Sequence, residues 1–285
     1  MQLFIQTLFN VLIVASIYIL VGLGFAFIFH MLGTFNVAHG AIYMVAGYLG
    51  YIAIGLWGIN PWIGFALVII VIGAFGLFLE RFCFRPFLED FNNQIMIGVA
   101  ITAILTTTVN IWLGSRALII PSFVSGVLHV GPYPIAWEKI LVFGIGFTIL
   151  GSMVWFAKFT RWGKQMQAIT QNREAAALQG INIYHIAAIV SALGCALAAV
   201  AGVMVGALYV LDPFMGQNIL TKILILVILA GVGSIAGIFV IGLMLGVLYS
   251  VLPVFLPGNI ADVAAFSIVC ILILLRPQGF FGHEA

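Results

Sequence analysis

The chain has 285 residues, of which 64% are hydrophobic and only 6% are charged, against about 25% charged residues in an ordinary soluble domain. Its formal net charge of +2 is too small to indicate a nucleic-acid partner. A soluble core with this composition would leave too little polar surface to cover it. The composition therefore excludes an ordinary soluble domain and indicates an integral membrane protein.

Long stretches of the chain, residues 1–79, 175–211 and 223–261, contain no Asp, Glu, Lys or Arg. A helix needs about 20 apolar residues to cross a bilayer core of about 30 Å, so the larger stretches hold more than one span. In chain order, the predicted spans lie near residues 4–30, 40–57, 62–79, 94–114, 140–158, 185–209, 218–232, 236–252 and 260–275.

Two parts of this map, residues 33–57 and 218–252, are short and rich in glycine, which favours broken or re-entrant helices. We therefore expect eight to ten crossings. The predicted fold class is all-α: a polytopic transmembrane helical bundle forming a single domain over residues 1–285.

Cationic residues indicate the orientation, because cytoplasmic loops carry an excess of Lys and Arg. The loops near 80–93 and 158–184 and the tail that begins at Arg276 hold most of the cations. These three segments are predicted to be cytoplasmic, and the segment 115–139 is predicted to lie outside. Nine spans would then place the N-terminus outside, whereas eight or ten would place it inside.

Small residues recur at every fourth position in two of the predicted spans. They are Gly194, Ala198, Gly202 and Gly206, and then Gly242 and Gly246. Small residues at this spacing let helix backbones approach closely within a bilayer. We expect these faces to be helix–helix contacts.

The segment 158–184 is a polar island in an otherwise apolar chain, and it contains good helix formers. Asn172 is a plausible N-cap, Glu174 would lie in the first turn, and Gly180 is a natural residue to follow the helix end. These signals predict a short cytoplasmic helix over residues 173–179. An ordinary helical loop is the alternative interpretation.

Polar and helix-breaking residues, Asn36, His39 and Gly40, interrupt the first charge-free stretch. Such residues at membrane depth face a partner or a cavity, and transporters use broken helices to contact substrate. We hypothesise that 33–40 and the glycine-rich segment 231–237 line a pathway. His39 could instead be a structural histidine bonded to a carbonyl, whereas no residues at ligand spacing favour a metal site.

Three charged residues, Asp212, Lys222 and Asp262, lie near the predicted outer ends of spans, where interfacial placement accounts for each. The three cysteines, Cys83, Cys195 and Cys270, are scattered through apolar runs. They indicate neither a disulfide framework nor a metal site.

Glu174-Ala175-Ala176, followed by three residues and Gly180, resembles the EAA-x-x-x-G signature of ABC importer permeases, although the family's Ile-x-Leu-Pro extension is missing. Three more segments are similar to the branched-chain amino acid permeases. They are Gly33-Thr34-Phe35-Asn36-Val37-Ala38-His39-Gly40, Gly231-Val232-Gly233-Ser234-Ile235-Ala236-Gly237 and Arg276-Pro277-Gln278-Gly279-Phe280-Phe281-Gly282. The matches follow the order of the family over nearly the whole chain.

This resemblance implies a non-enzymatic permease subunit in a bacterial inner membrane, with 158–184 as the coupling loop that docks on an ATPase. The implied coupling residues are Asn172, Arg173, Glu174, Ala175, Ala176, Leu178 and Gly180. The expected pathway residues are Asn36, His39, Gly40, Gly231, Gly233 and Ser234.

The chain contains no G-x-x-x-x-G-K-[ST] phosphate-binding loop, so we expect it to bind no cofactor and to depend on ATP and Mg²⁺ held by a partner. The implied partners are a second homologous permease, cytoplasmic ATPase subunits and a periplasmic binding protein. The implied substrates are branched-chain or other small neutral amino acids, related amides or small organic acids. A self-sufficient carrier and an intramembrane enzyme are the competing classes. A carrier would need coupling carboxylates at membrane depth, and the candidates, Glu80 and Asp262, lie near predicted span ends; an enzyme would need convergent catalytic groups, which the sequence does not show.

Overall fold

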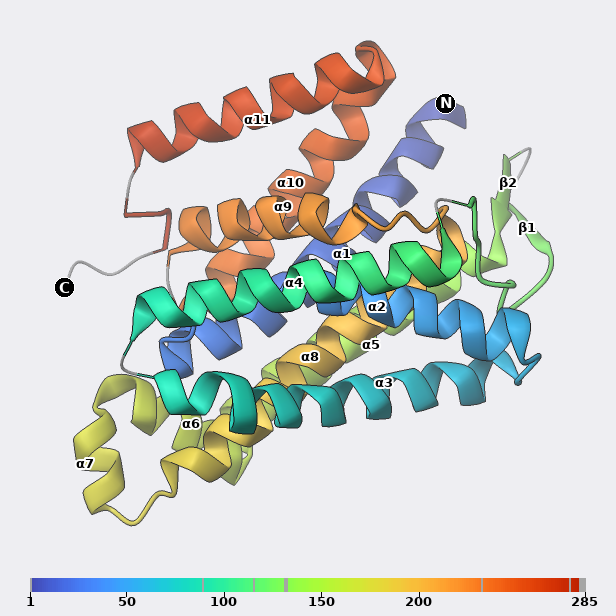
Figure 1. Ribbon diagram of the computed structural model, residues 1–285. Coiled ribbons are helices and arrows are strands. Elements are labelled where there is room, and N and C mark those ends of the chain that lie inside the picture. The colour runs from blue at the N-terminus through green and yellow to red at the C-terminus, as the bar shows by residue number, and fades with distance from the viewer. Residues whose placement is uncertain are drawn as a thin grey trace.

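The computed structural model describes residues 2–88, 90–114, 116–130, 133–231, 233–276 and 278–281, and these residues form a bundle of helices (Figure 1). The α-helices are α1 (Gln2–Leu32), α2 (His39–Gly50), α3 (Pro61–Phe78), α4 (Phe91–Leu113), α5 (Trp137–Phe159), α6 (Arg161–Gln171), α7 (Arg173–Leu178), α8 (Ile183–Leu208), α9 (Met215–Ala230), α10 (Ile235–Phe255) and α11 (Gly258–Leu275). Two π-helical segments, η1 (Tyr51–Leu56) and η2 (Leu79–Phe84), and the 3₁₀ turn η3 (Arg85–Phe87) continue α2 and α3.

Within the described residues, eight helical segments are long and apolar enough to cross a membrane, which confirms the predicted all-α, polytopic class. The ninth predicted span, 218–232, corresponds to α9, an apolar helix of 16 residues that is short of the roughly 20 residues a full crossing needs. The sequence did not predict the antiparallel hairpin of β1 (Val127–Val130) and β2 (Tyr133–Ala136), which lies in the segment 115–139.

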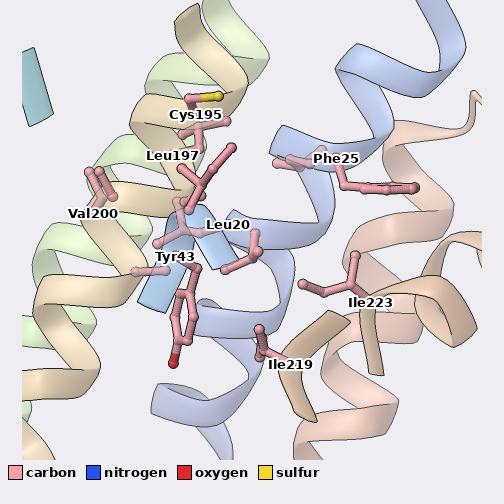
Figure 2. Packing of buried hydrophobic residues seen from close by; sticks show 14 of the residues in the cluster. Leu20, Phe25, Tyr43, Cys195, Leu197, Val200, Ile219 and Ile223 are labelled. Atoms are coloured by element: carbon pink, nitrogen blue, oxygen red, sulfur yellow. The ribbon is translucent and has the colours of Figure 1, made fainter. Parts of the chain in front are cut away.

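The centre of the bundle is α1, which packs against α8, α10, α5 and α9 (Figure 1). In the most apolar part of α1, 89% of the residues are buried, against 11% in α4. Figure 2 shows Leu20 of α1 in the core between Tyr43 of α2, Leu197 of α8 and Ile223 of α9, with Phe25 further along α1. The helices α3, α4, α5 and α11 therefore form the periphery, where apolar side chains remain exposed.

The small-residue stripes form the predicted helix contacts. A Cβ atom added to Gly24 of α1 would lie 2.6 Å from the carbonyl oxygen of Gly194 of α8, and Gly202 lies directly against the carbonyl of Tyr43. On α10, Gly246 meets Ala15 of α1, with 2.6 Å between the added Cβ and that of alanine. Only glycine allows such close backbone approach, because any side chain would collide with the facing helix.

The cationic segments gather at one end of the bundle. Arg85, at the end of α3, donates a hydrogen bond to the carbonyl of Tyr184 at the start of α8, which joins the first two segments. The helices α6 and α7 lie at this end, and the hairpin lies at the opposite end (Figure 1). The residues 80–87, predicted as a loop, are instead a helical continuation of α3. We refer below to the end with α7 as the inner end and to the end with the hairpin as the outer end.

Candidate functional site

The polar island folds into two short helices, and the second, α7, is defined by local capping. The side chain of Asn172 accepts a hydrogen bond from the amide of Ala175 at 2.9 Å, which satisfies one free donor of the first turn. At the other end, the amides of Gly180 and Ile181 donate to the carbonyls of Ala177 and Ala176. Gly180 has a φ of +82°, and this pair of bonds is a Schellman motif. The predicted helix, N-cap and terminating glycine are confirmed.

The two faces of α7 differ in exposure. Ala176 is 4% exposed and packs inward, whereas Leu178 is 89% exposed. Arg173, Glu174 and Ala175 are exposed as well. Of the residues predicted to couple to an ATPase, Ala176 therefore anchors the helix within the chain, and Leu178 presents an apolar side chain outward at the tip of the bundle.

An ion pair fixes the chain where the polar island returns to the bundle. The guanidinium of Arg85 donates two hydrogen bonds to the carboxylate of Glu80, at 2.9 and 2.7 Å, and a third to the carbonyl of Tyr184 at 3.3 Å. Glu80 is 1% exposed. We call these three residues the inner staple. Because Tyr184 follows Gly180 by four residues, the staple ties the segment after α7 to the end of α3.

The first predicted break, residues 33–40, contains a largely buried non-helical connection over residues 33–38 between α1 and α2, whereas His39 and Gly40 are already the first residues of α2. Nε2 of His39 lies 3.2 Å from the carbonyl oxygen of Val21 in α1, which is the bond expected of a structural histidine. Gly40 lies directly against the carbonyl of Gly216. Oδ1 of Asn36 and Nδ1 of His39 are buried without a hydrogen-bond partner among the described residues. Each such orphan costs about 1–3 kcal/mol, so this connection is less well satisfied than the helices around it.

The second predicted break lies at the inner end, between α9 and α10. Gly233 faces the imidazole of His30, near the end of α1, and lines a cavity of about 330 Å³ with residues of α1 and α6. Ser234 caps α10 by accepting a hydrogen bond from the amide of Gly237 at 3.0 Å, and Gly231 ends α9. Val232 of this segment, and Pro277 and Gly282 of the terminal motif, are outside the described residues. The two breaks thus flank the same end of α1, and the described lining of this cavity includes Gly233 but none of Asn36, His39 and Gly40.

The structure also brings together polar residues for which the sequence predicts only interfacial placement. Lys222, Tyr249 and Asp262 line one cavity of about 340 Å³ in the outer half of the bundle. They come from α9, α10 and α11, so no sequence spacing relates them. The charge of Lys222 within an otherwise apolar helix was the one available signal, since ionisable groups at membrane depth are functional candidates.

A bundle of membrane-spanning helices with buried breaks, polar cavities and a capped helix projecting from one end defines a polytopic membrane transport protein. The family described as "Branched-chain amino acid transport system / permease component" matches residues 7–275. The chain belongs to this family, as its motifs predicted.

Individual relatives match along almost their whole length. The chain is 32% identical to the high-affinity branched-chain amino acid transport system permease protein BraD of Pseudomonas aeruginosa, covering 98% of this chain and 96% of the relative. It is 29% identical to the permease protein LivH of Escherichia coli K12 and of Salmonella typhimurium, with the same coverage. The solved structure of PsaBC from Streptococcus pneumoniae in complex with Fab shares the fold, with a TM-score of 0.52, 16% identity and coverage of 95% of this chain and 92% of that one.

Proposed function

We propose that this chain is the membrane-spanning subunit of an ATP-driven importer in a bacterial inner membrane, which carries branched-chain or other small neutral amino acids, or related amides and small organic acids. A cytoplasmic partner hydrolyses ATP with Mg²⁺, a second homologous permease completes the pathway, and a periplasmic binding protein delivers the substrate. The names of the relatives support the substrate class. The observation that carries the proposal is the exposed, capped helix α7.

Leu178 makes α7 suited to docking on another protein. A leucine that is 89% exposed at the tip of a polar segment is stabilised when a partner's apolar groove covers it. The Asn172 cap and the Gly180 terminus fix the helix before docking, which lowers the ordering cost of binding. The inner staple connects the segment that follows α7 to the end of α3, so a displacement of α7 by its partner would also move the ends of α3 and α8.

The pathway role of the breaks is part of the same proposal. Asn36, His39 and Gly40 lie beside α1, α8 and α9, and the orphaned polar atoms of Asn36 and His39 would gain partners if the break became hydrated during transport. Gly233 already lines the cavity of about 330 Å³ at the inner end, and Gly231 and Ser234 lie on either side of Gly233 in the turn between α9 and α10.

Substitution of Leu178 tests the coupling role. Because the side chain is exposed, Leu178→Asp should leave the fold intact and reduce copurification of the ATPase subunit about 30-fold, the effect of losing an interface hot spot. Leu178→Met keeps an apolar side chain and serves as the matched control. Unchanged ATPase binding by Leu178→Asp would refute the role of α7.

Uptake in proteoliposomes separates the importer from a self-sufficient carrier. Purified chain, partner permease, ATPase and binding protein should accumulate labelled leucine only when ATP is present on the ATPase side. Uptake that persists after the ATPase subunit is omitted would favour a carrier and contradict the proposal.

A further inference from the structure

The outer cavity is a polar site within the membrane-spanning part of the bundle. It lies between α1, α2, α8, α9, α10 and α11, and we define it by the residues that line it: Val14, Ile17, Tyr18, Tyr43, Val205, Tyr209, Met215, Asn218, Ile219, Lys222, Tyr249 and Asp262. Its volume of about 340 Å³ falls in the range of roughly 300–1,000 Å³ that is usual for small-molecule sites.

Lys222 enters this cavity without a carboxylate partner. Its ammonium lies 4.1 Å from the ring centroid of Tyr249 and 5.7 Å from that of Tyr18, so two aromatic faces hold it by cation–π attraction. Within the described ranges, the pair of Arg85 and Glu80 is the one salt bridge. The positive charge of Lys222 is therefore positioned by the rings and takes part in no direct ion pair among the described residues.

Asp262 supplies the opposite charge in the same cavity. It is exposed near the start of α11 and also lines an adjoining space with Asn218, Thr221 and Lys222. The two charges thus share a cavity and its neighbour but stay more than 4.0 Å apart, since no ion pair joins them. An ionised group facing lipid is costly, which favours a water-filled or ligand-filled space on this side of the chain.

Apolar residues line the rest of the cavity. Val14 and Ile17 on α1, Val205 on α8, and Met215 and Ile219 on α9 lie around the polar groups. One site therefore combines a cation, a separate anion and an aliphatic surface, with no net charge from its two ionised groups. These are the complements of a carboxylate, an ammonium and an aliphatic side chain.

We infer that the outer cavity binds the zwitterionic head of an aliphatic α-amino acid on the outer side of the pathway, with Lys222 binding the carboxylate and Asp262 the ammonium. This inference rests on the proposed import of amino acids and deepens it by naming the residues that receive the substrate. The tyrosine rings hold Lys222 in place, and the aliphatic lining contacts the side chain of the substrate. The separation of the two charges leaves room for the substrate to bridge them.

Charge removal with a charge-retaining control tests the site. In proteoliposomes with the complete importer and saturating binding protein, Lys222→Met and Asp262→Asn should each lower the rate of leucine uptake about tenfold or more, the effect of losing one charged hydrogen bond. Lys222→Arg should keep most of the uptake. Lys139→Met removes a cation that bonds Asn10 outside the cavity, and it should stay within about twofold of the parent, as expected of a surface charge contact.

Labelling of a cysteine at Asn218 separates binding from a merely structural role. In a background without the three native cysteines, Asn218→Cys should react with a membrane-impermeant thiol reagent from the outer side. Leucine delivered by the binding protein should slow the reaction, and leucinamide, which lacks the carboxylate, should not. The added Lys222→Met substitution should abolish this protection.

The outcomes distinguish the two proposals. If the parent importer shows no ATP-dependent leucine uptake, the proposed function itself is refuted. Normal parent uptake that is unchanged in Lys222→Met would overturn only the binding site. Labelling could instead be slow only in vesicles that contain phosphatidylethanolamine, whether or not leucine is present. That result would identify a lipid head group as the occupant of the cavity and would also overturn the proposed amino-acid site.

Discussion

Replacement of Arg85 by alanine should destabilise the whole protein, because it leaves a buried carboxylate without its partner. Glu80 is 1% exposed and receives two hydrogen bonds from the Arg85 guanidinium. The same guanidinium stacks on the ring of Tyr184, with 5.0 Å between Cζ and the ring centroid. Arg85→Ala removes all of these contacts at once and detaches the start of α8 from the end of α3.

The structure sets the expected size of this effect. Removal of one partner from a buried ion pair costs about 3–5 kcal/mol. Arg85 is itself 29% exposed, so water reaches part of the site and the expected loss is near the lower limit, about 3 kcal/mol. By the scaling of soluble domains, this loss corresponds to a fall in Tm of about 6–12 °C.

Thermal unfolding of the detergent-purified protein, followed by fluorescence, is the appropriate assay. Arg81→Ala is the matched control, because Arg81 is exposed and its guanidinium lies 5.8 Å from the ring centroid of Phe82, a contact worth about 0.5–1 kcal/mol. Glu80→Gln combined with Arg85→Ala should recover part of the loss, since the buried charge is gone. If Arg85→Ala unfolds at the same temperature as Arg81→Ala, the inner staple does not stabilise the fold.

Three further substitutions test the packing and the caps. Gly194→Leu should reduce Tm and expression, because an added Cβ would lie 2.7 Å from the carbonyl oxygen of Gly24 and overpacking costs about 1–3 kcal/mol. Gly151→Leu is the control and should reduce neither, because nothing lies within 4 Å of the added Cβ. Equal losses of Tm in the two variants would contradict the close packing at Gly194. Asn172→Ala removes a cap worth about 1 kcal/mol, so amide exchange of α7 should rise about fivefold by mass spectrometry, and unchanged exchange would contradict the cap. Gly180→Ala strains a residue at φ +82° by about 1–2 kcal/mol and should weaken ATPase copurification, whereas the same change at the α-helical residue Gly144 should not.

The prediction from sequence was accurate where the signal is local. Each predicted span corresponds to a helix because an apolar run of sufficient length must satisfy its own backbone hydrogen bonds in a bilayer. The helix α7 was predicted within one residue, because Asn172 and Gly180 act on amides and carbonyls only a few positions away. The short hairpin was missed, since its strands carry no alternating apolar pattern of useful length.

For the candidate site as well, the sequence predicted the local features and the tertiary structure showed the contacts between distant segments. Membrane residence, the capped helix α7 and the close-packed glycine faces followed from the sequence, because apolar length, capping and four-residue spacing are properties of single segments. Only the tertiary structure showed that Glu80 is neutralised by Arg85, that His39 bonds Val21 in α1, and that Lys222 and Asp262 share the outer cavity. These contacts join different segments of the chain, and the packing of the helices decides which residues come together.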